Sequence, residues 1–112
     1  MDPNVIRECY AAYLARDRAR VDALLGDDLV FHSPDDPHLD KHGYFERCWA
    51  GGDTFAALRI EKLFVQGNEA FVRYECETKD GRRFRNSELF RVEGGKIREI
   101  DVYYGGGGEH LR

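Results

Sequence analysis

Hydrophobic residues in the first part of the chain recur at helical spacing. Ile6, Cys9, Tyr10, Tyr13 and Leu14 follow one another at intervals that place them on one side of a helix. The Asp-Pro pair just before them is typical of a helix start, because an acceptor side chain can cap the helix and proline lacks an N–H that would need a partner there. The pattern therefore predicts an amphipathic N-terminal helix.

A second, shorter helix is predicted through Val21, Leu24 and Leu25, with Gly26 as its left-handed C-cap. The segment 29–33 then indicates a short strand that Pro34 ends. Asp-Asp-Pro-His follows as a turn-forming stretch.

Asp40 is placed to cap a third helix, which the pair Gly51-Gly52 would close. That helix carries four apolar or aromatic residues: Tyr44, Phe45, Cys48 and Trp49.

The second half of the chain reads as β-structure. Four runs of strand-forming residues cover 58–65, 70–78, 84–92 and 96–104. Gly67-Asn68, Asp80-Gly81 and Gly94-Gly95 separate them, and such pairs form tight hairpin turns. Consecutive strands joined by short turns are antiparallel neighbours, so a four-stranded meander is expected.

Helices come first and strands later, which is the order of an α+β domain. We expect the three N-terminal helices to pack on a curved, mixed, mostly antiparallel sheet and to enclose a pocket. The length of 112 residues suits one domain. We assign that domain to residues 1–104 and interpret the glycine-rich segment 105–112 as a flexible tail.

Charge and hydropathy exclude several classes of partner. The net charge of −4 argues against nucleic acid, whose phosphates require a clustered excess of lysine and arginine. No apolar stretch approaches the roughly 20 residues that cross a bilayer, so no membrane partner is expected. The charged N-terminus does not resemble a signal peptide, which predicts a cytoplasmic protein.

The sequence shows no motif for a metal or a cofactor. The three cysteines are far apart and lie within apolar patterns, so they are predicted to be buried, reduced thiols. His38 and His42 with their neighbouring aspartates match no standard ligand spacing, and a loop over the cavity mouth is the expected role of that segment. A phosphate-binding glycine loop is also lacking.

The segments "LGDDLVFHSP" and "LFRVEGGKIREIDVYY", together with the first-helix tyrosine and the third-helix aromatics, are similar to SnoaL-like and ketosteroid-isomerase-like proteins. These belong to the NTF2-like superfamily, which has a cone-shaped, cystatin-like fold. The resemblance implies that a small hydrophobic molecule binds inside the cone. It leaves the chemistry open, since the superfamily holds isomerases, dehydratases, cyclases and non-catalytic binders.

The same resemblance implies a site. In the steroid isomerases a tyrosine of the first helix and a protonated carboxylic acid of the sheet stabilise an oxyanion. By position, Tyr13 matches the tyrosine, Glu88 the acid and Ser33 the basic residue. Serine cannot take a proton from carbon unless another base activates it. His32 is therefore the third candidate catalytic residue beside Tyr13 and Glu88, with Asp35 as the other candidate base.

Asn86, Glu88 and Phe90 alternate along one run and should share one face of their strand. Glu88 could alternatively form a salt bridge with an arginine such as Arg73, and Tyr13 could be a core residue bonded to backbone. The predicted ligand contacts are Ser33, Phe45, Trp49, Tyr74, Asn86 and Tyr104.

Three hypotheses about function follow. The first is an enzyme that transfers protons on a small hydrophobic molecule, as an isomerase, cyclase or dehydratase without a cofactor. The second is a non-catalytic domain that binds such a molecule. The third is a dimerisation module. Leu63, Val65, Phe71 and Leu89 are predicted on the outer sheet face, and exposed apolar residues there indicate a homodimer.

Overall fold

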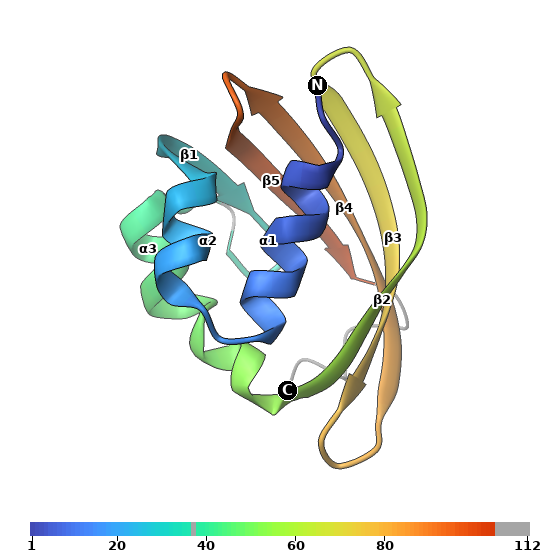
Figure 1. Cartoon of the computed structure of the whole chain (residues 1–112). Helices are drawn as coiled ribbons and strands as arrows, with labels where there is room; N and C mark the ends of the chain where they lie inside the picture. The colour runs from blue at the N-terminus through green and yellow to red at the C-terminus, as the bar shows by residue number, and fades with distance from the viewer. Residues whose placement is uncertain (37, 105–112) are drawn as a thin grey trace.

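The computed structural model describes residues 1–36 and 38–104, so the predicted tail 105–112 lies outside the described residues. Helices pack on one side of a curved sheet (Figure 1). The helices are α1 (Asn4–Leu14), α2 (Arg18–Leu24), α3 (Lys41–Arg47) and the 3-10 helix η1 (Ala50–Thr54). The strands are β1 (Leu25–His32), β2 (Phe55–Gln66), β3 (Glu69–Thr78), β4 (Arg83–Glu93) and β5 (Lys96–Tyr104).

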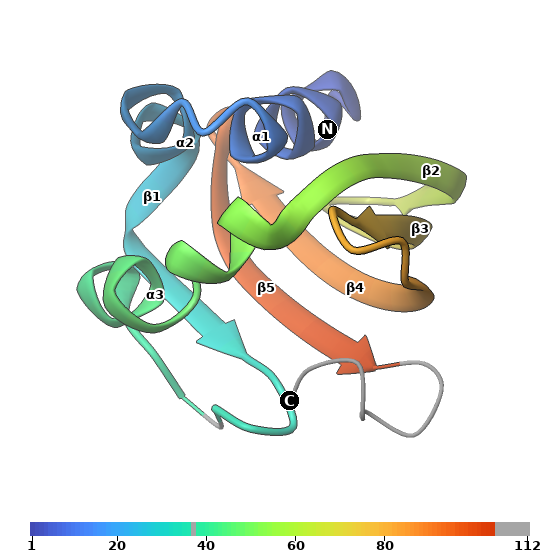
Figure 2. The same ribbon diagram turned by 90° about the horizontal axis from the view of Figure 1, so that it is seen from below.

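The strand order in the sheet is β1-β5-β4-β3-β2. The last four strands form the predicted antiparallel meander, and β1 pairs in parallel with β5 at the other edge. Gly67 and Gly81 adopt φ of 61° and 90° in two of the hairpin turns, a conformation that glycine reaches without strain. Figure 2 shows the chain crossing from β1 to β2 through α3 and η1, which lie over the concave side of the sheet.

The helix starts follow the predicted capping chemistry more closely than the helix ends do. The Asp40 carboxylate accepts a hydrogen bond from the Gly43 N–H at 2.8 Å and caps α3. The Asp2 carboxylate accepts from the Asn4 N–H at 2.9 Å, although the N-cap position itself is held by Pro3. Side-chain acceptors therefore satisfy backbone donors at both helix starts.

The prediction that Gly26 is a left-handed C-cap is wrong. The backbone is already extended at Leu25, with φ −87° and ψ 137°, and Gly26 is the second residue of β1. A Cβ on Gly26 would lie 2.6 Å from Nη1 of Arg98. The glycine therefore makes room for a neighbouring side chain and does not serve a special backbone conformation.

Two element boundaries also differ from the predictions. The first strand begins at Leu25 and not at residue 29, because Leu25 pairs with Ile97 of β5. Helix α3 ends at Arg47, so Cys48 and Trp49 lie in the turn before η1. Both differences come from pairing and packing partners that are distant in the sequence.

The core lies between the helices and the concave face of the sheet. Ile6 of α1, Val21 of α2 and Ile97 of β5 are fully buried, and Phe90 of β4 is 1% exposed. Burying each such side chain stabilises the fold by about 1.5–3 kcal/mol. The three cysteines are free thiols; Cys9 and Cys76 are buried as predicted, whereas Cys48 is only partly buried.

A bulge in β2 overturns part of the predicted outer face. The pairing of β2 with β3 shifts between Ile60 and Lys62, so the alternation of β2 reverses beyond that point. Leu63 and Val65 pair with the buried Val72 and Ala70 and therefore lie on the concave side, contrary to the prediction; Leu63 packs against the core, whereas Val65 is 43% exposed.

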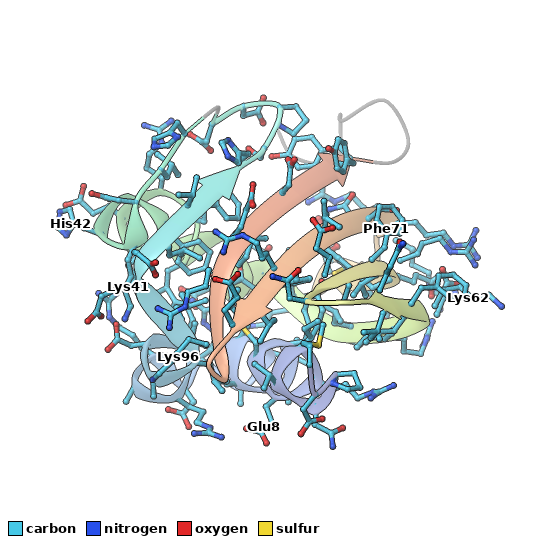
Figure 3. The ribbon with its side chains drawn as sticks, turned by 90° about the horizontal axis from the view of Figure 1, so that it is seen from above. Glu8, Lys41, His42, Lys62, Phe71 and Lys96 are labelled. Atoms are coloured by element: carbon cyan, nitrogen blue, oxygen red, sulfur yellow. The ribbon has the colours of Figure 1, made fainter. Side chains whose placement is uncertain are left out.

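Phe64 and Phe71 pair with each other on the outer face and are 65% and 43% exposed. Leu89 lies opposite Phe71 on β4, on the same face. In Figure 3, Phe71 and Glu8 of α1 mark opposite sides of the sheet.

Candidate functional site

The concave side of the sheet holds a cavity of about 310 Å³. Side chains of α1, the α3–η1 segment and strands β3, β4 and β5 line it, and most of them are apolar or aromatic. A cavity of this size is at the small end of the range for ligand sites, which favours a compact ligand.

Strand β4 brings two polar side chains into this apolar wall. Asn86 and Glu88 are 5% and 8% exposed and alternate with outward-facing residues, as the period-two spacing predicts. Glu88 is flanked on the same face by Phe90, and across the sheet it lies opposite Val72 and Val102. A carboxyl group is therefore placed among apolar neighbours.

A short chain of hydrogen bonds ends on the Glu88 carboxyl. The Tyr74 hydroxyl donates to Oε2 of Glu88 at 2.5 Å, and Nδ2 of Asn86 donates to the Tyr74 hydroxyl at 3.3 Å. Each group in this chain donates to the next, so the carboxyl is held in one orientation. The predicted alternative of a salt bridge between Glu88 and Arg73 does not occur, because Arg73 pairs with Glu61 on the outer face.

Burial raises the pKa of Glu88 from an ordinary value of 4.5 to about 7, because an apolar environment disfavours the charged form. The hydroxyls of Tyr74 and Tyr10 oppose this rise by stabilising the carboxylate. Burial also raises the pKa of the cavity-lining thiols Cys9 and Cys48 to about 12, so both stay protonated near neutral pH. Glu88 is thus able to exchange a proton near neutral pH.

Tyr10 is a site residue that the sequence reasoning missed. Its ring lines the cavity and packs against Tyr74 and Phe90, with centroid separations of 5.2 and 5.7 Å. Its hydroxyl oxygen is buried close to Glu88, yet it makes no hydrogen bond of normal geometry with any described residue. Tyr10 lies on the same apolar helix stripe as Tyr13, and only the packing of α1 on β4 determines which of the two hydroxyls lies beside Glu88.

Tyr13 lines the cavity, but its hydroxyl is engaged elsewhere. It donates to the backbone oxygen of Cys48 at 3.1 Å, and its ring packs edge-on against Trp49 at 5.5 Å. Burial, the largest cause, raises the Tyr13 pKa, and the Arg16 guanidinium counteracts it. This matches the predicted alternative in which Tyr13 is hydrogen-bonded to backbone.

His32 and Ser33 lie outside the cavity lining. Ser33 is 8% exposed, and its hydroxyl accepts from the Asp36 N–H at 3.0 Å, so it closes the turn after β1. Nε2 of His32 lies 3.8 Å from Glu99, and its ring is 5.6 Å from that of His38. The strand alternation turns His32 away from the concave side, because Phe31 beside it lines the cavity.

The remaining predicted contacts divide into two groups. Tyr74, Asn86 and Tyr104 line the cavity. Phe45 and Trp49 pack against each other at 5.7 Å and lie behind the wall. The predicted aromatic lining is therefore only partly present, since the turn after α3 directs Trp49 toward Arg16.

The mouth of the cavity is charged. Asp35 and Asp36 line it from the turn after β1, and Arg47 lines it from the end of α3. Nε of Arg47 donates to Oδ1 of Asp36 at 2.6 Å. The sequence analysis did not name Arg47 as a site residue, because a charged residue at the end of a helix is normally exposed to solvent.

Two further properties concern residues 1–36 and 38–104. They contain no cluster of His, Cys, Asp or Glu that could hold a metal ion. None of their helices has the length and the apolar character to cross a membrane.

The family model described as "SnoaL-like domain" matches residues 6–100. The chain belongs to the SnoaL-like family. Its helices and curved five-stranded sheet form the NTF2-like cone, as the sequence resemblance implied. A comparison with curated proteins gives no match.

Solved structures share this SnoaL-like fold at low sequence identity. A protein from Kribbella flavida has a TM-score of 0.85 and 15% identity, over 96% of this chain and 89% of that one. A candidate polyketide cyclase from Sinorhizobium meliloti has a TM-score of 0.76 and 16% identity, over 90% and 94%. A candidate ketosteroid isomerase, also from Kribbella flavida, has a TM-score of 0.74 and 18% identity, over 97% and 85%.

Proposed function

We propose that this SnoaL-like domain binds a small hydrophobic carbonyl compound in the cone cavity and moves a proton on it through Glu88. The observation that carries the proposal is the buried Glu88 carboxyl, whose pKa is raised to about 7 at the wall of an apolar cavity. A general acid–base group works best when its pKa lies near the working pH. The cyclase and isomerase descriptions of two structural neighbours agree with such chemistry.

In this proposal Glu88 is the base, since Ser33 and His32 lie outside the cavity lining and the other candidate, Asp35, lines the cavity from an exposed position. The ionised carboxylate takes a proton from the carbon next to the ligand carbonyl, and the electron pair of the C–H bond moves into the carbonyl to form an enolate. Tyr10, whose hydroxyl lies beside Glu88 without a well-aligned hydrogen bond to a described residue, donates a hydrogen bond to the enolate oxygen once Glu88 has taken up the proton. Glu88 then returns the proton to the same or to another carbon.

Deuterium exchange tests this proposal. The enolisable ketone 2-tetralone in deuterated buffer should lose its α-protons faster with the protein present, by roughly 100- to 10,000-fold at equal concentration of carboxylate base. The rate should rise as Glu88 ionises, with a midpoint near its pKa of about 7. Proton NMR of the ketone measures the exchange.

Matched variants separate catalysis from binding. Glu88→Gln should abolish the acceleration, whereas Glu69→Gln, which removes the same charge from an exposed position, should keep it. The fluorescence of Trp49, the one tryptophan of the chain, can report binding. Bound 2-tetralone with no accelerated exchange would identify a non-catalytic binding domain instead.

A second proposal concerns assembly: the outer sheet face pairs with a second copy of the chain. Phe64 and Phe71 are both strongly exposed there. The charges beside them are paired within the sheet, with Glu61 bridging Arg73 and Arg85 at 3.2 and 3.0 Å. This cluster carries one net positive charge beside the exposed phenylalanines, and a twofold copy would cover the apolar patch that they form.

Phe71→Asp should convert the dimer into a folded monomer, because the new carboxylate would be buried without a partner in the interface. Sedimentation velocity measures the change, and circular dichroism verifies the fold. A monomeric parent protein, or a dimer that tolerates the substitution, would refute the pairing.

A further inference from the structure

The charges that line the cavity do not cancel. Arg47 is the one basic residue among the described lining residues, and its Nε contact with Asp36 offsets the charge of that carboxylate. Asp35 also lines the cavity, and no basic side chain of the described residues lies within ion-pair distance of it. The lining therefore carries a net negative charge at its mouth even when Glu88 is protonated.

Asp35 and the aromatic residue Tyr104 line the same cavity. Burial is the main cause that raises the pKa of Tyr104, the Ser33 hydroxyl lowers it, and the negative charge of Asp35 contributes to the rise. Tyr104 itself lines the cavity at the end of β5. A carboxylate and an aromatic face together are a good environment for an organic cation, which gains from both the charge and the ring quadrupole.

The position of this pair relative to Glu88 follows from the strand register. Tyr104 lies opposite Asn86, the inward-facing residue that precedes Glu88 on β4. Glu88 is 8% exposed, whereas the side chain of Arg47 at the mouth is 61% exposed. A ligand in the cavity therefore meets Glu88 at its inner end and Asp35 at its outer end.

A separate observation indicates that the inner end receives a neutral polar group. The Tyr10 hydroxyl is buried beside Glu88, where it stabilises the carboxylate but forms no well-aligned hydrogen bond with a described residue, and its ring forms part of the wall. A ligand oxygen would satisfy that donor.

We propose that the ligand of this cavity carries a protonated amine at its outer end, which Asp35 and the Tyr104 ring receive at the mouth. The inference rests on the proposed function, since it names the charge class of the molecule that Glu88 acts on. The inner part of the ligand is a compact hydrophobic body with a carbonyl oxygen. Anionic analogues are disfavoured, because the only cation of the described lining is already paired with Asp36.

Three probes with one ring system test the charge class: 2-naphthylmethylamine, 2-naphthylmethanol and 2-naphthoate. Isothermal titration calorimetry near neutral pH should show the amine binding about tenfold more tightly than the alcohol, with the naphthoate weakest. The advantage of the amine should shrink at high salt, because the mouth is exposed to solvent.

Variants show which carboxylate binds the ammonium group of the probe. Asp35→Asn should bring the affinity for the amine down to that for the alcohol, and Glu69→Gln should leave their ratio unchanged. Equal affinities for amine and alcohol, or a preference for the naphthoate, would overturn the inference. A preference that disappears in Glu88→Gln and persists in Asp35→Asn would overturn the placement at the mouth.

The two proposals fail in different ways. If 2-tetralone is exchanged and no probe shows a preference for the amine, the charge class is wrong and the proton transfer stands. If the cavity binds none of the naphthyl probes or 2-tetralone, the proposed function is wrong, and the inferred ligand class is wrong with it.

Discussion

The free energy of unfolding is expected to fall by roughly 3 kcal/mol between about pH 4.5 and pH 8 because of Glu88 alone. In the native state the carboxyl keeps its proton up to a pKa of about 7, whereas in the unfolded chain it loses the proton near 4.5. The native state therefore binds more protons within this interval. Stability contributed by this group is complete below the unfolded pKa and is lost as the pH rises through the folded one.

Urea denaturation of the parent protein and of Glu88→Gln at several pH values measures this contribution. The variant should lack the decline, so the difference between the two proteins should change with pH by roughly 3 kcal/mol. Exposed carboxylates such as Glu61, whose pKa is lowered mainly by its hydrogen bond from Arg85, titrate in both proteins and cancel in the difference. Parallel pH profiles would show that Glu88 ionises as freely in the native protein as in the unfolded chain.

Phe90→Ala should destabilise the domain by about 3–5 kcal/mol. Phe90 is the largest of the fully buried side chains, and it contacts the Tyr10 ring edge-on, with centroids 5.7 Å apart. Its removal leaves a void between α1 and β4 that rigid neighbours cannot fill. For a domain of this size the loss is a large fraction of the total stability.

Chemical denaturation measures this effect, and Phe90→Leu serves as the control. Leucine keeps most of the apolar volume, so its loss of stability should be clearly smaller than that of alanine. Similar small losses for both variants would mean that the inner wall is not closely packed. In that case Tyr10 would not be held beside Glu88 by packing, and its assignment as a hydrogen-bond donor to the ligand would have to be abandoned.

The strands of the meander were predictable because their signals are local. Glycine pairs fixed the hairpins, and the alternation along residues 84–92 placed Asn86 and Glu88 together on the buried face. The bulge near Glu61 was not predictable, since no glycine or proline marks it in β2. It reversed the faces of Leu63 and Val65, because one additional residue changes the side of every residue beyond it.

The candidate site was predictable only where one element decides the direction of a side chain. The family resemblance pointed to Glu88, and strand period placed it on one face with Asn86 and Phe90, which the structure shows to be the buried face. Tyr10 and Tyr13 share one helix stripe, so the choice between them depended on how α1 lies on the sheet. His32 was a candidate because imidazole is a suitable general base, but its position on β1 directs its side chain toward Glu99.

By itself the sequence determined the α+β class, the order of helices and strands, the antiparallel meander and the common face of Asn86, Glu88 and Phe90, because spacing, caps and turns act within a few residues. The tertiary structure alone decided that β1 pairs with β5 and that the hydroxyl of Tyr10, and not that of Tyr13, lies beside Glu88. It also decided that Asp36 holds Arg47, while no basic side chain among residues 1–36 and 38–104 pairs with Asp35. Those contacts join residues far apart in the chain. The packing of distant elements determines these contacts, and a local sequence pattern cannot predict that packing.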